Sequence, residues 1–137
     1  MSECTDITTD KRRSLKENKR KFTFNNPAQI EMAITKVDGC KYTDSLMERC
    51  DYEARIAGTE YYIELKGKNV PKGISQLEST IKLMSADVKS APKKAYVVCT
   101  RSAPAAQPSI LTARARFKRA YNSSLSITTI QHEEKVS

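Results

Sequence analysis

Alternation of apolar and polar side chains, with a period of two residues, marks the first half of the chain. Phe22 and Phe24 alternate with polar neighbours, and residues 30–34 repeat the pattern before an Asp38-Gly39 pair. A period of two is typical of a strand with one buried face, and Asp-Gly is a strong turn signal. Residues 27–37 are also long enough for a helix, but their β-branched content favours a strand.

The clearest alternation spans residues 49–66. Apolar side chains separated by mostly charged ones lie on both sides of a short Ala57-Gly58-Thr59 turn. They are Cys50, Tyr52, Ala54 and Ile56 before the turn, and Tyr61, Ile63 and Leu65 after it. We therefore expect an antiparallel β-hairpin with one packed face and one polar face.

The period changes to three and four residues after position 73. The apolar positions of this segment are Ile74, Leu77, Ile81, Met84 and Val88, and Pro92 follows them. Because this spacing puts all five on one stripe, it predicts a helix over 73–90.

The remaining segments complete a mixed domain. Residues 94–100 are almost continuously apolar, as in a strand covered on both faces. A Pro/Ala loop over 102–109, a short helix over 110–121 and a strand over 125–130 follow. The order of elements predicts an α/β (α+β) domain, with a mixed central β-sheet, an antiparallel hairpin meander, a helix crossover and flanking helices.

Basic side chains are concentrated near the N-terminus. Seven lysines and arginines fall between residues 11 and 21, where Leu15 is the only large apolar residue. Such a run cannot bury a face by itself. We therefore expect a flexible basic arm over 1–21, one folded domain over 22–131 and a tail over 132–137. The arm is either a solvated tail or an electrostatic grip on phosphates.

The composition fits one small domain with an anionic partner. The 137 residues are 39% hydrophobic, and 24 Lys and Arg against 16 Asp and Glu give a formal net charge of +8. An excess of this size points to a polyanion such as nucleic acid. No apolar run approaches the roughly 20 residues of a membrane-spanning helix, so we expect no membrane partner.

The cysteines do not suggest a metal site. The chain has Cys4, Cys40, Cys50 and Cys99 without a C-x-x-C spacing, and a single histidine, His132. Zinc ligation is disfavoured on this spacing. We expect all four thiols to be reduced and the protein to be cytoplasmic.

Two acidic residues meet if the hairpin closes tightly at Ala57-Gly58. In that register Asp51 lies opposite Glu64 on the polar face, and Lys66 lies one step along, opposite Arg49. Like charges across a ladder repel, and a divalent cation between two carboxylates removes the repulsion. Hard oxygen ligands suit Mg²⁺ or Mn²⁺. The other interpretation is a solvent-exposed hairpin face that happens to be charged.

Asp51, the thirteen-residue step and the tripeptide Glu64-Leu65-Lys66 resemble the motif of the PD-(D/E)XK nuclease superfamily. The strand, turn, strand, helix and strand over roughly residues 45–100 resemble the core of small Holliday-junction resolvases and restriction endonucleases. The resemblance implies a restriction-endonuclease-like fold for the domain.

The resemblance also implies roles for individual residues. Asp51, Glu64 and the backbone carbonyl of Leu65 would bind the metal. Lys66 would position or deprotonate the attacking water, and Gln76 matches a polar residue that many members carry near the metal. Gln76 is equally compatible with an ordinary surface glutamine.

The chain departs from the family pattern in two places. Cys50 stands where a proline usually precedes the first Asp. Many members also carry a further Glu on an N-terminal helix, and Glu17 and Glu31 are the candidates for it here.

Additional basic residues are candidates for contacts with nucleic acid. They are Lys68, Arg101, Arg114, Arg116, Lys118 and Arg119. The last four cover more than one face of their predicted helix, which suits a phosphate backbone, although a solvated helix is the alternative.

The hypothesis that follows is a metal-dependent nuclease, formally an endonuclease or phosphodiesterase, using Mg²⁺ or Mn²⁺, with DNA favoured over RNA. A homodimer would be one way to extend its reach. The alternative is a catalytically inactive nucleic-acid-binding or protein-interaction module on the same fold. A basic adaptor for an acidic protein is a third hypothesis.

Overall fold

Nine strands and two helices make up the described part of the chain. The computed structural model describes residues 3–67, 69–100 and 107–136, with the backbone alone for residues 66 and 67. The first strands are β1 (Thr5–Thr8), β2 (Arg12–Glu17), β3 (Arg20–Asn25), β4 (Met32–Lys36), β5 (Tyr52–Ile56) and β6 (Thr59–Gly67). After them come α1 (Val70–Met84), β7 (Lys93–Cys99), α2 (Pro108–Tyr121), β8 (Ser123–Thr129) and β9 (Gln131–Lys135).

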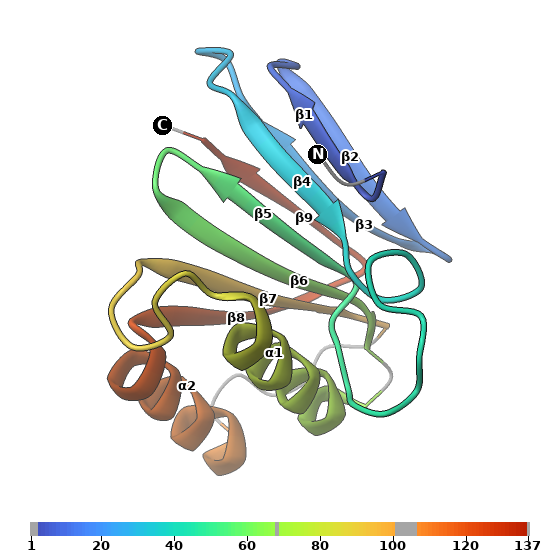
Figure 1. Cartoon of the computed structure of the whole chain (residues 1–137). Helices are drawn as coiled ribbons and strands as arrows, with labels where there is room; N and C mark the ends of the chain where they lie inside the picture. Colours follow the sequence, from blue (N-terminus) through green and yellow to red (C-terminus); the bar gives the residue numbers. More distant parts are fainter. Residues whose placement is uncertain (1–2, 68, 101–106, 137) are drawn as a thin grey trace.

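The larger sheet is mixed, as the sequence predicts. Its six strands lie in the order β1-β4-β5-β6-β7-β8, antiparallel from β1 to β6 and parallel from β6 to β8. Each parallel connection runs through a helix, α1 between β6 and β7 and α2 between β7 and β8. Both helices cover the same face of the sheet (Figure 1). The mixed α/β class with helix crossovers and flanking helices is therefore confirmed.

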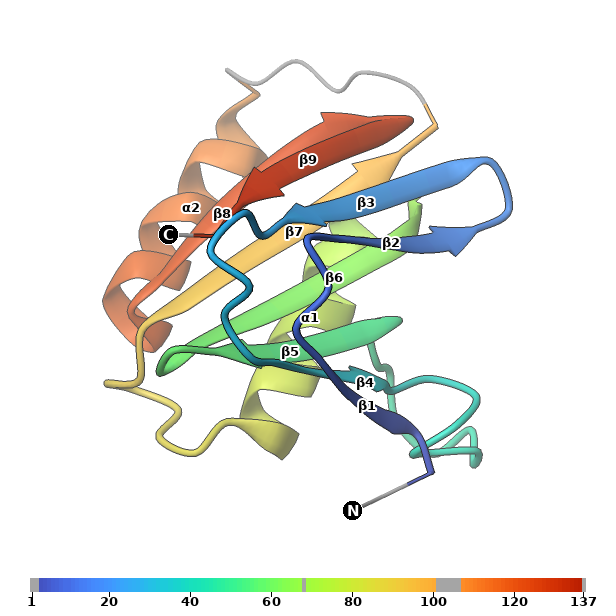
Figure 2. The ribbon, with the colours of Figure 1, turned by 90° about the horizontal axis from the view of Figure 1, so that it is seen from above.

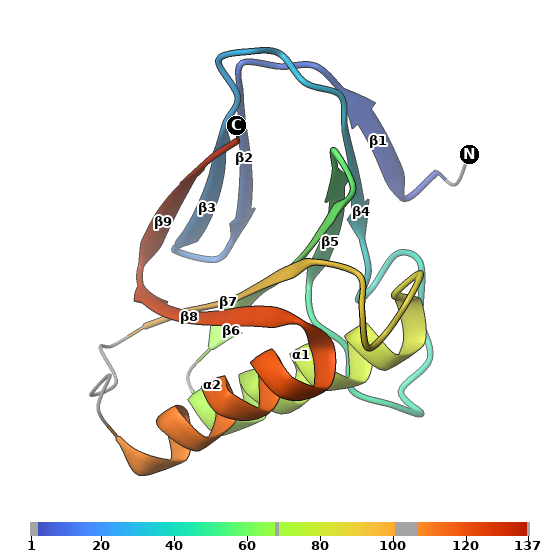
Figure 3. The same cartoon turned by 90° about the vertical axis from the view of Figure 1, so that its left-hand side faces the viewer.

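A second, three-stranded sheet lies on the opposite side of the large sheet from the helices (Figure 3). In it β2 pairs antiparallel with β3, and β9 pairs parallel with β3. Viewed from above, β3 lies over β6 and β7, with β2 and β9 on its two sides (Figure 2). Phe22 and Phe24 of β3 are fully buried against Tyr61 and Tyr96, so one hydrophobic core fills the space between the sheets.

The second core lies between the large sheet and the helices. Its centre is made of Tyr62, Leu77, Val97 and Phe117, all with no exposed surface. Because both faces of the central strands are covered, β7 is apolar almost throughout, in agreement with the prediction for residues 94–100.

Helix α1 begins and ends earlier than the predicted range of 73–90. Asn69 caps its N-terminus by accepting a hydrogen bond from the Lys72 N–H at 3.1 Å, and Pro71 is accommodated in the first turn. The chain leaves the helix at Ser85, whose backbone is extended. The apolar stripe continues to Val88 only because that side chain packs against the same core from the following loop.

The predictions of an N-terminal arm and a C-terminal tail are corrected by the structure. Residues 5–8 pair with β4, residues 12–17 pair with β3, and residues 131–135 pair with β3 from its other side. The basic run is thus a β-hairpin of the small sheet. Strand β3 of this hairpin also pairs with β9, which lies more than 100 residues further along the chain. Local composition does not reveal such a pairing.

The expectation of four reduced cysteines is also corrected. Cys4 and Cys40 form a disulfide, whereas Cys50 and Cys99 are buried free thiols. The expectation of a cytoplasmic location depends on reduced cysteines, so the disulfide removes the basis for that expectation. Within the described ranges, no helix is long and apolar enough to span a bilayer.

Candidate functional site

The β5–β6 hairpin has the predicted register. Tyr52 lies opposite Ile63, and Ile56 lies opposite Thr59 across the turn. Ala57 and Gly58 both have positive φ angles, 49° and 82°, as a two-residue hairpin turn of the favoured hand requires. Asp51 immediately precedes the first paired residue of β5, and Glu64 is the next residue along β6.

Asp51 is anchored to the strand that carries Glu64. Oδ2 of Asp51 accepts a 2.8 Å hydrogen bond from the backbone N–H of Leu65. The Asp51 carbonyl accepts another, also 2.8 Å, from the N–H of Val37. The side chain is 1% exposed. These bonds fix the carboxylate against the backbone between Glu64 and Lys66.

Glu64 lies on the face of β6 that α1 covers, and its side chain is 2% exposed. A Cβ atom on Gly73 of α1 would lie 3.6 Å from Cγ of Glu64 and 3.2 Å from Cγ1 of Val97. The glycine therefore allows the first turns of α1 to approach the sheet closely at Glu64.

The thiol of Cys50, which precedes Asp51, is fully buried. Burial raises the pKa of this thiol, and the negative charges of Glu64 and Asp51 raise it further. The register of the hairpin places Asp51 and Glu64 at neighbouring positions, and both side chains are buried.

Two residues of α1 tie the helix to the segment before β5. Nε2 of Gln76 donates to the Arg49 carbonyl at 3.3 Å. The Thr80 hydroxyl accepts from the Cys50 N–H and donates to the Gln76 carbonyl, both at 2.8 Å. Gln76, Asp51 and Glu64 consequently occupy one end of the α1–sheet interface.

The backbone of β6 is irregular at the predicted motif. Glu64 pairs with Val97 of β7, but the next registered pair is Gly67 with Cys99, so three steps on β6 match two on β7. A one-residue irregularity of this kind bends a strand and changes the direction of its side chains, and such bulges are common beside active sites. The backbone of Lys66 lies within it, and the Lys66 side chain is outside the described part.

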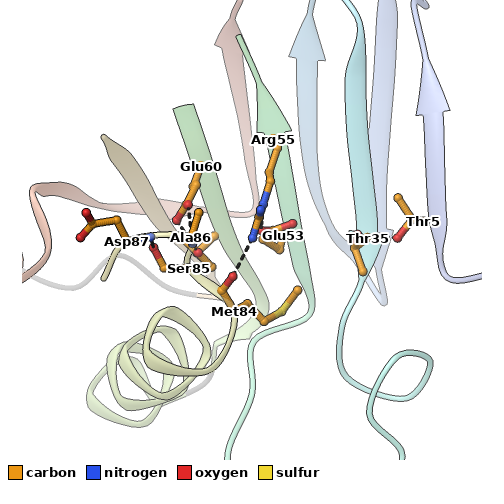
Figure 4. Close-up of polar contacts among 10 residues, drawn as sticks. Thr5, Thr35, Glu53, Arg55, Glu60, Met84, Ser85, Ala86 and Asp87 are labelled. Atoms are coloured by element: carbon orange, nitrogen blue, oxygen red, sulfur yellow. Dashed lines mark hydrogen bonds and ion pairs between the residues drawn. The ribbon is translucent and has the colours of Figure 1, made fainter. Parts of the chain in front are cut away.

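The acidic residues on the polar face of the hairpin are buried, which disagrees with the alternative interpretation of a solvent-exposed charged face. Helix α1 covers the polar face, and Glu53 and Glu60 are 2% and 3% exposed. This half of the face satisfies its own charges (Figure 4). Arg55 donates to Glu53 at 2.7 Å and to the Met84 carbonyl at 2.6 Å, while the Ala86 N–H and the Tyr62 hydroxyl donate to Glu60 at 3.0 Å and 2.7 Å.

Neither candidate for a third acid joins the pair. Glu17 lies on β2 and forms an ion pair with Lys36 at 3.6 Å, and Glu31 is exposed before β4. Among the described residues there is no group of three or more His, Cys, Asp or Glu side chains placed to hold one metal ion.

The candidate nucleic-acid residues divide into three groups. Arg116 is bound to Glu78 of α1 at 2.6 Å, and Arg114 donates to the Leu125 carbonyl at 3.0 Å, so both arginines hold α2 in place. Lys118 and Arg119 are exposed. Lys68 and Arg101 lie outside the described residues.

Sequence reasoning missed several residues that shape this region. Gly73 interrupts a helical pattern, and Thr80 interrupts the apolar stripe between Leu77 and Ile81; each exception marks a close contact. Arg49, expected on the polar face, instead turns into the loop before β5. It is 4% exposed, bonded to Asp44 and placed over the ring of Tyr42 at 5.0 Å.

Comparison with known proteins adds no relative: no family model, curated protein or solved structure matches the chain.

Proposed function

We propose that the chain is a metal-dependent nuclease that hydrolyses phosphodiester bonds in DNA, with a site made of Asp51, Glu64 and Lys66. One observation carries the proposal. Two buried carboxylates, Asp51 just before β5 and Glu64 on β6, lie at neighbouring positions of the hairpin, and the backbone that bonds Asp51 continues directly into Lys66. This is the arrangement expected of a PD-(D/E)XK nuclease, with the antiparallel β5–β6 pair, α1 and parallel β7 as its restriction-endonuclease-like core.

The donor set fits a hard divalent cation. Two buried carboxylates repel each other and are costly to keep charged away from water. A cation bound by both relieves that cost, and carboxylate and carbonyl oxygens suit Mg²⁺ or Mn²⁺. Asp51, Glu64 and the carbonyl of Leu65 would hold it. Such an ion supplies hydroxide at neutral pH and offsets charge on the phosphate.

The remaining groups act on water and phosphate. An ammonium group at Lys66 stabilises the negative charge that develops on the phosphate and orients the attacking water. Gln76 is held to the Arg49 carbonyl beside the acids, where its amide can position water or a phosphate oxygen. The close approach of α1 at Gly73 accompanies the burial of Glu64, and both carboxylates have little contact with solvent.

The proposal is tested by cleavage of supercoiled plasmid, single-stranded DNA and RNA with Mg²⁺ or Mn²⁺. The expected result is metal-dependent cleavage by the parent protein that is lost in Glu64→Gln and Lys66→Ala. Glu31→Gln, which removes an exposed carboxylate remote from the site, is the matched control and should cleave like the parent. Cleavage that survives in Glu64→Gln, or no cleavage by the parent with either metal, overturns the proposal.

A second candidate function is a nucleic-acid-binding module without catalysis. It is favoured by the finding that no third acid accompanies Asp51 and Glu64 among the described residues. Tight binding of DNA by a parent protein that cleaves no substrate would support this function.

A further inference from the structure

The basic β2–β3 turn meets the larger sheet at the carboxyl end of β7. The Lys21 N–H donates to the Ile130 carbonyl at 3.0 Å, and the Ile130 N–H donates to the Cys99 carbonyl at 2.9 Å. These bonds tie the start of β3, the β8–β9 corner and the end of β7 together. The run of positive charge is therefore held at a fixed place on the domain.

A hollow of about 530 Å³ opens at this junction. Asn18, Lys19, Arg20, Thr100 and Ile130 line it. A smaller hollow of about 210 Å³ adjoins it and adds Lys16 and Lys21. Lys16 and Lys19 are exposed, so the rim is positively charged and open to solvent.

Arg20 gives this hollow the character of a built site. Its side chain is largely buried, with the residue 8% exposed, and it donates to the Thr100 hydroxyl. Nε of Arg20 is buried and has no hydrogen-bond partner among the described residues. A guanidinium has five N–H donors in a planar fork that suits a phosphate, and burying one is costly unless the charge meets an anion.

Ile130 adds an apolar surface that the fold holds under strain. Its φ angle is 67°, a left-handed conformation that is rare for a β-branched residue, and its side chain is 54% exposed. Strain of this kind costs about 1–3 kcal/mol and is concentrated at functional positions. An exposed apolar side chain between basic groups suits contact with a sugar or base beside a bound phosphate.

The hollow and the candidate metal site lie toward the same end of β6 and β7, on opposite faces of the large sheet. Cys99, next to Thr100, pairs with Gly67, and Gly67 is three residues after Glu64 on β6.

We propose that Arg20, Lys19 and Asn18, with Thr100, form a phosphate subsite. It binds the backbone of the same nucleic acid to one side of the bond that is cut. Lys16 and Lys21 extend it toward the next phosphate. The location of the cut rests on the proposed function, whereas the phosphate contact does not.

The test measures binding of a short DNA duplex by Glu64→Gln protein in EDTA, where no cleavage occurs, over a range of salt concentrations. In that background we compare Lys16→Ala/Lys19→Ala with Lys82→Ala/Lys89→Ala. Both double variants remove two exposed lysines, but Lys82 and Lys89 lie at the end of α1 and in the loop after it. The turn variant should weaken binding about tenfold and reduce the salt slope by about 2, while the control stays like the parent.

Arg20→Lys keeps the charge but removes the fork. We expect weaker duplex binding with an unchanged salt slope, and a thermal unfolding scan confirms that the variant is folded. Equal binding by both lysine double variants overturns the subsite.

Plasmid cleavage by the parent separates the two proposals. If the parent cleaves but the turn variant binds like its control, the subsite alone fails. If the parent cleaves nothing and the turn variant still loses binding, the nuclease proposal fails and the subsite stands.

Discussion

The backbone N–H of Leu65 donates a 2.8 Å hydrogen bond to Oδ2 of Asp51. Leu65 lies between Glu64 and Lys66 in the sequence, and its N–H anchors the carboxylate of Asp51. Its side chain is fully buried in the core between the sheets, so the anchor is held by packing on one side and by the hairpin on the other. This hydrogen bond holds the Asp51 carboxylate beside the strand that carries Glu64, as the predicted register requires.

The Leu65 contact separates catalytic from structural effects at Asp51. Asp51→Asn keeps an oxygen that can accept the Leu65 N–H but removes the charge, so cleavage should fall at least about 100-fold with little loss of stability. Asp51→Ala removes the acceptor as well and leaves a buried N–H unsatisfied. It should lose about 1–3 kcal/mol in the free energy of unfolding. Urea titration and plasmid cleavage measure the two effects, and equal stability losses in both variants would contradict this division.

Gly73 should not tolerate a side chain. Alanine favours a helix by about 0.5–1 kcal/mol over glycine, but here its Cβ would lie 3.2 Å from Cγ1 of Val97. Val97 is fully buried on a central strand and, being β-branched, has little rotamer freedom. We expect Gly73→Ala to lower the free energy of unfolding by about 1 kcal/mol and Gly73→Val by more. Denaturant titration checks this order, and a stabilised Gly73→Ala would show that α1 is not tightly docked.

Two glutamates, the buried Glu53 and the partly buried Glu78, should contribute to stability with opposite dependence on pH. Burial raises the pKa of Glu53 despite its bond to Arg55, so the stability of the folded state falls as pH rises through that raised pKa. Burial also raises the pKa of Glu78, but hydrogen bonds from Arg116 and Tyr121 lower it more. Its net pKa is lowered, and its contribution is lost as pH falls through it.

The free energy of unfolding of Glu53→Gln, taken relative to that of the parent, should therefore be higher near neutral pH than below the ordinary glutamate pKa of 4.5. The free energy of unfolding of Glu78→Gln, taken relative to that of the parent, should be lowest near neutral pH. Free energies of unfolding measured across this range test both signs, and a shift of both variants in the same direction would refute the assignment.

The Cys4–Cys40 disulfide should be a major source of stability. It joins the residue before β1 to the loop after β4, across a sequence separation of 36 residues. A cross-link of this length removes chain entropy from the unfolded state worth about 3–4 kcal/mol. Dithiothreitol should lower the unfolding temperature of the parent but leave a Cys4→Ser/Cys40→Ser variant unchanged. Equal sensitivity of the two proteins would rule out the cross-link.

The hairpin and both helices could be predicted because their signals are local. The alternation around Ala57-Gly58 fixes the register, and the apolar stripe from Ile74 to Ile81 defines α1. Strand β2 escapes such reasoning because Leu15 is its only buried residue, and β9 because it is polar throughout and is placed by pairing with β3. The ring centroid of His132 in β9 lies 5.5 Å from that of Phe22 and 5.2 Å from that of Tyr96. No local sequence pattern predicts these contacts.

The candidate site was predictable in part for the same reason. Hairpin parity brings Asp51 and Glu64 together, but it says nothing of what covers them. Alternation of charged residues does not show whether the face is open to water, whereas in the structure Glu53 and Glu60 are buried and have hydrogen-bond partners. The basic hollow at Arg20 depends on contacts among β3, β7 and β9, which only the tertiary structure provides.

The most direct test of the account is anomalous diffraction from crystals of the protein soaked with Mn²⁺. The account predicts one anomalous peak bonded to a carboxylate oxygen of Asp51 and one of Glu64, and the loss of that peak in Glu64→Gln crystals. Full soaking with no peak between these two side chains, or a peak bound only elsewhere on the protein, would contradict the shared metal site on which the nuclease proposal depends.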